Sequence, residues 1–358
     1  MTELNKKEFT MANILVTGNM GYIGPVLVKR LKKDFIGCRV FGYDTGYFAH
    51  MLTNANVLPE IFVDRQYFGD MRDFPESLLD GVDVVIHLAA ISNDPIGNVF
   101  EEVTEEINSN ASVRIAKLAK EKGCSRFVFA SSCSVYGAAG DGARKENDSL
   151  DPLTAYARSK VYMEQELEKL ADDNFVTTNL RYSTACGMSP RIRLDLVLND
   201  FVASALTTGK IEILSDGTPW RPLIDVKDMA TAMIWAISRE SEKGGVSLSV
   251  NVGRNDWNYQ IKDVAKVVED VLENVEIQVN PNAMPDNRSY QVDFSLYESL
   301  APQHQPKVDL AQSVIEVRDG LTAMGFSDGQ FRNSQFMRLK VLQKHIDEKR
   351  LSNELRWI

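Results

Sequence analysis

Short apolar runs rich in Val, Ile and Phe alternate with helix-like segments through the first half of the chain. The predicted strands cover residues 14–17, 39–43, 82–88, 126–130 and 175–180, and the predicted helices cover 25–33, 109–122 and 156–170. Strands that alternate with helices of this length form βαβ units, in which helices cover both faces of a parallel sheet. The pattern therefore predicts an α/β fold with a doubly wound parallel sheet.

The alternation breaks after about residue 187, where turn-forming residues become frequent, for example in 188–191, 215–222 and 281–286. A predicted helix over 225–238 and a predicted strand over 248–252 return the chain to the main sheet. We therefore expect a sheet domain over 12–187 with returns near 223–253, a smaller α/β lobe mainly over 188–330, and a C-terminal helical extension over 333–358.

The composition narrows the class of partner. Of 358 residues, 44% are hydrophobic and 25% are charged, as in ordinary globular proteins, and the formal net charge is -10. A net acidic chain is a poor ligand for a nucleic-acid backbone. Four cysteines show no paired or metal-ligand spacing, so neither a disulfide framework nor a metal site is expected. Residues 1–10 are polar and no run approaches the ~18 apolar residues of a membrane span, so we expect a cytoplasmic protein that does not bind membranes.

A glycine-rich turn follows the first predicted strand. Residues 17–24 read Thr-Gly-Asn-Met-Gly-Tyr-Ile-Gly and lead into a helix. Glycines at this spacing permit a tight turn and let backbone N–H groups approach a pyrophosphate at the helix N-terminus. Asp44 ends the second predicted strand, where a carboxylate accepts hydrogen bonds from an adenosine ribose and repels a 2′-phosphate, unless it only begins a loop. The turn predicts a Rossmann-like dinucleotide site, and Asp44 favours NAD over NADP.

Tyr156 and Lys160 are four residues apart, so both side chains leave the same face of the predicted helix. A lysine ammonium beside a phenol is expected to lower its pKa towards the working pH, which makes the tyrosine a general base or acid. Ser132 follows the strand 126–130, at the carboxyl edge of the sheet where ligands bind. Turn-forming serines and a solvated Tyr/Lys face are the alternative reading. With the glycine turn upstream, the three residues predict a catalytic site that oxidises a carbinol.

In this order and spacing the chain resembles the extended short-chain dehydrogenase/reductases, in particular the NAD-dependent nucleotide-sugar epimerase/dehydratase family. The resemblance covers about residues 12–330 and includes His-Leu-Ala-Ala at 87–90 and Ser-Ser-Cys-Ser-Val-Tyr-Gly at 131–137. It implies that Ser132, Tyr156 and Lys160 are catalytic. It also implies a cofactor site made of Gly18, Gly21, Tyr22, Ile23, Gly24, Asp44, Asp70, Met71, Leu88, Ala89, Ala90, Asn108, Tyr156 and Lys160.

Substrate binding is expected from the smaller lobe, since a nucleotide diphosphate needs cations and arginine suits bidentate contact. By resemblance the substrate-binding residues are Ser134, Thr184, Arg191, Arg193, Arg221 and Arg288. For any one arginine, a surface ion pair is an equal alternative. Thr184 stands where many relatives have Asn, which leaves the nucleotide open.

The reaction is narrowed by two positions beside the catalytic serine. The family's sugar 4,6-dehydratases carry Asp and Glu directly after it, whereas this chain has Cys133 and Ser134. Elimination then lacks its proton carriers, so we favour a nucleotide-sugar epimerase, in particular a 4-epimerase that passes through a transient 4-keto sugar. A 4-dehydrogenase/reductase that releases the keto sugar is the alternative. A 4,6-dehydratase or a non-catalytic dinucleotide sensor is disfavoured. The segment 189–201 resembles enzymes of surface-polysaccharide biosynthesis.

A homodimer is also predicted. The helices over 109–122 and 156–170 carry apolar stripes that resemble the four-helix dimer contact of the family. Stripes that face the protein's own core are the alternative.

Overall fold

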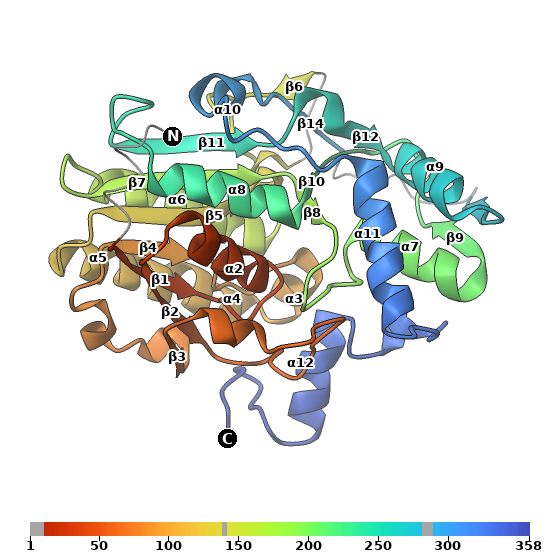
Figure 1. Ribbon diagram of the computed structural model, residues 1–358, viewed down its shortest axis with the longest axis horizontal. Coiled ribbons are helices and arrows are strands. Elements are labelled where there is room, and N and C mark those ends of the chain that lie inside the picture. The colour runs from red at the N-terminus through yellow and green to blue at the C-terminus, as the bar shows by residue number, and fades with distance from the viewer. Residues whose placement is uncertain (1–10, 138–141, 281–288) are drawn as a thin grey trace.

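A seven-stranded parallel sheet forms the centre of the computed structural model, which describes residues 11–137, 142–280 and 289–358 (Figure 1). Its order is β11-β7-β5-β4-β1-β2-β3, and every adjacent pair is parallel. The strands are β1 (Asn13–Thr17), β2 (Arg39–Asp44), β3 (Arg65–Phe68), β4 (Val84–His87), β5 (Arg126–Ser132), β7 (Val176–Tyr182) and β11 (Ser247–Val252). The predicted Rossmann-like fold is confirmed.

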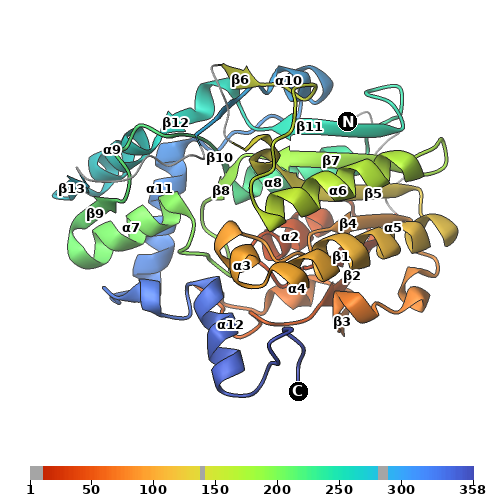
Figure 2. The ribbon, with the colours of Figure 1, turned by 180° about the vertical axis from the view of Figure 1, so that it is seen from behind.

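Helices cover both faces of the sheet. On one face lie α2 (Gly24–Asp34) and α8 (Val226–Ile237) (Figure 1), and on the other lie α5 (Ser112–Glu121) and α6 (Ala155–Leu170) (Figure 2). Side chains alternate across a strand, so Ile14 and Val16 join the core under α2 and α8 while Leu15 joins the opposite core. This alternation of fully buried residues is why the strands read as continuous apolar runs.

The predicted elements of the sheet domain appear within a few residues of their expected bounds. The helix expected over 109–122 differs most, because it continues from α4 (Glu101–Glu105) through a π-helical turn, η4 (Glu106–Ala111), before α5. Short elements that the pattern did not show are α3 (Asp94–Val99), η1 (Pro59–Phe62), η2 (Met71–Asp73), η3 (Glu76–Leu79) and η5 (Cys133–Tyr136). Strand β11 lies at the edge of the main sheet next to β7, and helix α8 packs against the same sheet.

A second hydrophobic core lies beside the carboxyl edge of the sheet. It is built from α7 (Val197–Thr208), α9 (Ile261–Leu272) and α11 (Leu310–Ala323) and includes the fully buried Leu198, Val264 and Val314. Small sheets accompany it: β8 (Thr184–Cys186) with β10 (Trp220–Asp225) and β12 (Asn258–Gln260), and β9 (Lys210–Ile213) with β13 (Glu276–Val279). Further elements are β6 (Ala143–Arg144), β14 (Gln291–Val292), η6 (Asn255–Trp257) and α10 (Ser295–Leu300).

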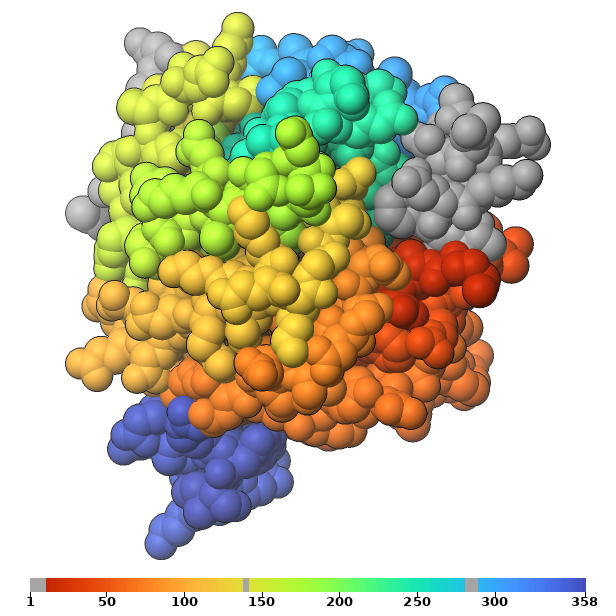
Figure 3. Space-filling view, turned by 90° about the vertical axis from the view of Figure 1, so that its left-hand side faces the viewer, coloured from red at the N-terminus to blue at the C-terminus, as the bar shows by residue number. Residues whose placement is uncertain are grey.

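The C-terminal segment, residues 331–358, contains η7 (Phe331–Asn333) and α12 (Arg338–Asp347). It leaves the smaller lobe and packs beneath the N-terminal half of the sheet, where it projects in the space-filling view (Figure 3). Leu342, Leu351 and Leu355 of this segment belong to the same buried cluster as Tyr43 and Tyr47. Within the described ranges, none of the helices has both the length and the apolar character needed to cross a membrane.

Candidate active site

A cavity of about 890 Å³ lies at the carboxyl ends of the parallel strands, between the sheet and the smaller lobe. This volume is at the upper end of the ~300–1,000 Å³ typical of small-molecule sites. The cavity opens where the order of the strands reverses, because β1 lies between β2 and β4. Ligands bind at such switch points in open α/β sheets.

The glycine turn forms one wall of the cavity. Gly18 has φ +73°, and a Cβ atom there would lie 2.5 Å from the backbone nitrogen of Ala89. Gly21 faces the cavity, and a Cβ atom there would meet only Gly18 O, at 3.2 Å. A Cβ atom on Gly24 would lie 2.1 Å from Asn19 O, so this glycine serves the packing of the turn and does not line the cavity. The backbone therefore forms the cradle that a dinucleotide pyrophosphate requires.

Asp44 lies at the end of β2 and lines the same cavity. Its carboxylate accepts hydrogen bonds from Met20 N (3.0 Å) and Gly46 N (2.7 Å), which ties it to the glycine turn. Burial raises the pKa of this carboxyl. The other predicted cofactor residues that line the cavity are Tyr22, Ile23, Asp70, Met71, Leu88, Ala89 and Ala90.

Asn108 stands outside the cavity lining. Its Oδ1 accepts from Ile91 N (2.8 Å) and its Nδ2 donates to Ile91 O (3.0 Å), so it fixes the backbone next to Ala90. The carboxylate of Asp70 is ion-paired with Arg72 at 2.6 Å. These two residues therefore shape the adenosine side of the site through the backbone and through a neighbouring ion pair.

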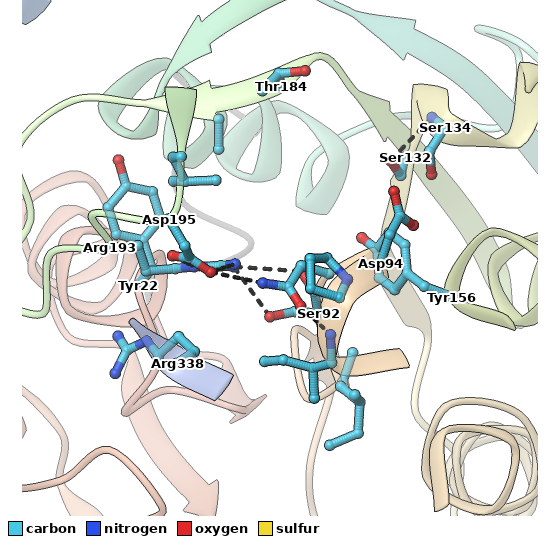
Figure 4. A pocket seen from close by; sticks show the side chains of 18 of the residues that line it. Tyr22, Ser92, Asp94, Ser132, Ser134, Tyr156, Thr184, Arg193, Asp195 and Arg338 are labelled. Carbon is cyan, nitrogen blue, oxygen red and sulfur yellow. Dashed lines mark hydrogen bonds and ion pairs between the residues drawn. The ribbon is translucent and has the colours of Figure 1, made fainter. Parts of the chain in front are cut away.

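Ser132, at the end of β5, and Tyr156 and Lys160, on α6, all line the cavity. Figure 4 shows Ser132 and Tyr156 there. Thr154 caps α6 by accepting from Ala157 N at 3.1 Å, so Tyr156 stands in the first turn of the helix. Lys160 Nζ donates to Ala130 O at 2.7 Å and lies 5.3 Å from the centre of the Tyr156 ring. The arrangement fits the predicted roles of a hydroxyl, a phenol and a lysine in one site.

The electrostatics of the cofactor-free site differ from the expectation that Lys160 lowers the pKa of Tyr156 towards the working pH. Burial and, to a smaller extent, the charge of Asp94 together raise the pKa of Tyr156 to about 12, although a side-chain hydrogen bond with Ser132 acts in the opposite direction. Burial also lowers the pKa of Lys160 to about 7, against which the charge of Glu164 acts. Lys160 is therefore only about half protonated at pH 7, and its charge does not outweigh the burial of the phenol.

A buried network behind the catalytic strand escaped the sequence analysis. Glu164, one helical turn after Lys160, forms an ion pair with Arg181 of β7 at 2.7 Å, and both side chains are buried. Ser131 Oγ donates to Glu164 Oε1 at 2.5 Å. This network holds the end of β5 and so positions Ser132. Its signal in the sequence was a second charged residue, one helical turn after Lys160, on the buried face of α6.

The predicted substrate residues divide into groups. Ser134, Thr184, Arg193 and Arg221 line the cavity, and Ser134 Oγ is buried with no hydrogen-bond partner in the described part of the chain. Arg193 forms an ion pair with Asp195 at 2.7 Å and bonds Ser92 Oγ at 3.2 Å. Arg191 is not among the lining residues. It is 1% exposed and paired with Glu60 at 2.7 Å, so its contacts are those of a packing residue. Arg288 lies outside the described residues.

Several charged cavity residues were missed by the sequence analysis. Among them, Asp94, at the start of α3, lies beside Tyr156, while Asp195 pairs with Arg193 (Figure 4). Arg338, from α12, is a lining residue that the C-terminal segment contributes. Each belongs to an element whose position depends on long-range packing, so no local motif marked it.

Comparison with known proteins identifies the family. The sequence profile of the NAD dependent epimerase/dehydratase family matches residues 14–253. An uncharacterized UDP-glucose epimerase, YtcB of Bacillus subtilis, is 30% identical over 269 residues, which are 72% of this chain and 81% of that protein. A UDP-glucose 4-epimerase of Neisseria meningitidis is 26% identical over 84% of this chain and 95% of its own length.

Solved structures agree with this result. MoeE5 in complex with UDP-glucuronic acid and NAD is 25% identical and superposes with a TM-score of 0.74, covering 87% of this chain and 99% of that one. The profile match, the relatives and the superposition therefore agree on the family and the fold. The chain is an NAD-dependent enzyme of the extended short-chain dehydrogenase/reductase type and belongs to the NAD-dependent epimerase/dehydratase family.

Proposed function

We propose that the chain is a nucleotide-sugar 4-epimerase that acts through a transient 4-keto sugar. The observation that carries the proposal is the placement of Ser132, Tyr156 and Lys160 in one cavity that runs from the glycine turn to the smaller lobe. The similarity to proteins named UDP-glucose epimerase and UDP-glucose 4-epimerase supports a UDP-linked hexose as the substrate class. We also propose that the enzyme is cytoplasmic and converts sugar precursors of surface polysaccharides.

The roles of the side chains follow from their contacts. Ser132 hydrogen-bonds the phenol of Tyr156 and is placed to orient the sugar hydroxyl beside it. Tyr156 takes the proton of that hydroxyl and later returns it. NAD held at the glycine turn and Asp44 would supply the hydride acceptor for the carbinol carbon and the hydride donor for its return. Lys160, when protonated, places a positive charge near the phenol and favours its ionised form.

The smaller lobe supplies the cations for a nucleotide diphosphate. Arg193 and Arg221 both line the cavity, and the guanidinium of Arg221 stacks 5.5 Å from the centre of the Tyr290 ring. Ser134 presents a buried hydroxyl to the same space. In an epimerase the keto sugar must turn and present its other face, which requires room beyond that of a tightly fitted ring. The volume of the cavity supports this requirement.

Dehydration is disfavoured at the two positions that follow Ser132. Cys133 is fully buried, its thiol donates to Arg181 O at 3.1 Å, and burial raises its pKa. A thiol held in this way is a poor proton carrier. Ser134 carries no ionisable group in the working range of pH. Neither side chain offers the acid or the base that elimination across the C5–C6 bond requires.

The test uses the purified protein with UDP-glucose, UDP-N-acetylglucosamine and UDP-glucuronic acid in separate reactions. Denatured extracts are first analysed for NAD, NADH and co-purified nucleotide sugar by mass spectrometry and absorbance. An epimerase forms the C4 epimer without net NADH, whereas a 4-dehydrogenase accumulates NADH and keto sugar in equal amounts. Tyr156→Phe should abolish either reaction, with Tyr162→Phe, on the exposed side of the same helix, as the control. Unchanged activity of Tyr156→Phe would refute the catalytic assignment.

A further inference from the structure

The C-terminal segment is fastened to both halves of the molecule. Arg332 forms an ion pair with Asp200 of α7 at 2.6 Å. At its other end Trp357 Nε1 donates to Thr45 O at 2.7 Å, and Leu355 O accepts from Tyr47 Oη. Both acceptor and donor lie in the loop directly after β2, which carries Asp44. The segment therefore spans the cavity on the side of the predicted adenosine site.

Arg338 is the first residue of α12 and is one of the residues of this segment that line the cavity (Figure 4). The side chain is buried, with an exposed fraction of 2%. Its guanidinium donates to Arg191 O (3.1 Å) and to Met51 Sδ (3.3 Å), and lies 4.1 Å from the centre of the Phe48 ring. Across the described ranges, no carboxylate lies within ion-pair distance of it. Several of its N–H donors therefore remain for a ligand.

A buried guanidinium without an anionic partner is unfavourable. Burial and the nearby charge of Arg193 lower the pKa of Arg338 to about 9, although the charges of Asp195 and Asp44 act in the opposite direction. Other cations of the site differ in this respect, because Arg193 is paired with Asp195 and Arg332 with Asp200. The charge of Arg338 is thus available to a bound anion.

The position of Arg338 indicates which anion this is. Arg338 lines the same cavity as Gly21, Ile23 and Asp44, and Asp44 accepts a hydrogen bond from Met20 N within the glycine turn. The glycine turn and the N-terminus of α2 are the dinucleotide pyrophosphate site, and the first turn of α2 holds no basic residue. At this turn a doubly charged pyrophosphate meets backbone donors, so a cation that balances its charge has to come from another wall of the cavity.

We propose that Arg338 is a ligand of the NAD pyrophosphate, supplied by the C-terminal segment. The segment then acts as a wall that closes over the adenosine half of the cofactor and slows its release. The proposal rests on the binding of NAD and holds whichever sugar the enzyme converts. The superposition with MoeE5 covers 99% of MoeE5 but 87% of this chain. This chain therefore carries segments that MoeE5 lacks.

The test compares Arg338→Met with Lys344→Met, which removes an exposed cation from the same helix outside the cavity. After bound NAD is removed, calorimetry measures the affinities for NAD, ADP and adenosine. We expect Arg338→Met to weaken NAD and ADP at least tenfold and to leave adenosine within twofold. Lys344→Met should leave all three unchanged. The dissociation rate of NAD should rise in the first variant alone.

Thermal unfolding supplies a readout that does not depend on catalysis. Without NAD, Arg338→Met should unfold at the same or a higher temperature than the natural chain, because an unpaired buried charge has been removed. The increase in unfolding temperature on adding NAD should be smaller. Unchanged affinities for NAD and ADP, or an equal loss for adenosine, would overturn the proposal. The same criteria apply to Arg338→Gln, which retains a polar side chain if the methionine variant does not fold.

Discussion

Replacing Lys160 by methionine should stabilise the cofactor-free protein at neutral pH while it removes activity. Lys160 is 4% exposed, and burial lowers its pKa from 10.5 to about 7. At pH 7 this amine is fully protonated in the unfolded chain but only about half protonated in the folded protein. The difference in pKa therefore destabilises the folded state by about 4 kcal/mol. Loss of the hydrogen bond to Ala130 O costs about 2 kcal/mol. The variant should therefore gain about 2 kcal/mol.

The sign of the pH dependence provides the sharper test. A lysine with a lowered folded-state pKa destabilises the fold below its unfolded pKa, and the penalty shrinks as the pH rises from about 7 towards 10.5. Between pH 7 and pH 9 the natural protein should gain about 2 kcal/mol relative to Lys160→Met. Urea unfolding, followed by tryptophan fluorescence on protein freed of NAD, measures this difference. Other titrating groups are common to both proteins and cancel.

Lys169→Met is the matched control for this experiment. Lys169 lies at the far end of the same helix, where it is exposed and paired with Glu166 at 2.5 Å. Its removal should change the stability by the same small amount at both pH values. If the difference between Lys160→Met and the natural protein were also equal at pH 7 and pH 9, the buried-amine argument would be refuted.

Three further predictions concern the turn, the catalytic phenol and the assembly. Asp94→Asn removes a charge that raises the pKa of Tyr156. The rise of kcat/KM with pH in the oxidation direction should therefore move to lower pH. A profile that does not move, or that moves to higher pH, would contradict the assignment of Tyr156 as the base. Gly18→Ala should abolish NAD retention, because a Cβ atom would meet Ala89 N. The ratio of nucleotide absorbance to protein absorbance in the purified protein measures this retention. Gly81→Ala has a similar φ of +72° in open space and should cost only about 1–2 kcal/mol of stability with NAD retained. Sedimentation velocity at micromolar concentration should show a homodimer, and a species with the mass of one chain would rule it out.

Strands of the central sheet were predictable because both of their faces are buried, which leaves an uninterrupted apolar run such as residues 14–16. The glycine turn and the Ser132, Tyr156 and Lys160 set were predictable because a local motif fixes the chemistry at a known place on the fold. The start of α5 was not predictable, because a π-helical turn precedes it. In this turn Ser112 Oγ donates a hydrogen bond to Ile107 O at 2.9 Å, and such a turn leaves no periodic pattern of apolar residues in the sequence.

The arginines show where sequence reasoning ends. Arg191 and Arg193 are separated by one residue and look equivalent in the sequence. In the structure Arg191 forms an ion pair with Glu60 away from the cavity, whereas Arg193 forms one with Asp195 in the cavity wall. Glu60 lies 131 positions from Arg191, so the choice depends on tertiary packing. Arg338 illustrates the same limit, because a charged helix near residue 338 gives no sign of the surface on which it docks. The pKa of Tyr156 was misjudged because burial is a property of the fold.

The docking of the C-terminal segment has a consequence for biosynthesis. The hydrogen bond between Trp357 and Thr45 joins residues 312 positions apart. Ribosomes add roughly 5–20 residues per second, so Thr45 waits roughly 16 to 60 s for its partner to be made. During that time the sheet can assemble from its N-terminal strands, while the wall that carries Arg338 is still absent. Nascent chains and prematurely terminated products then have an incomplete adenosine site, and firm retention of NAD becomes a mark of chains that were translated through the segment.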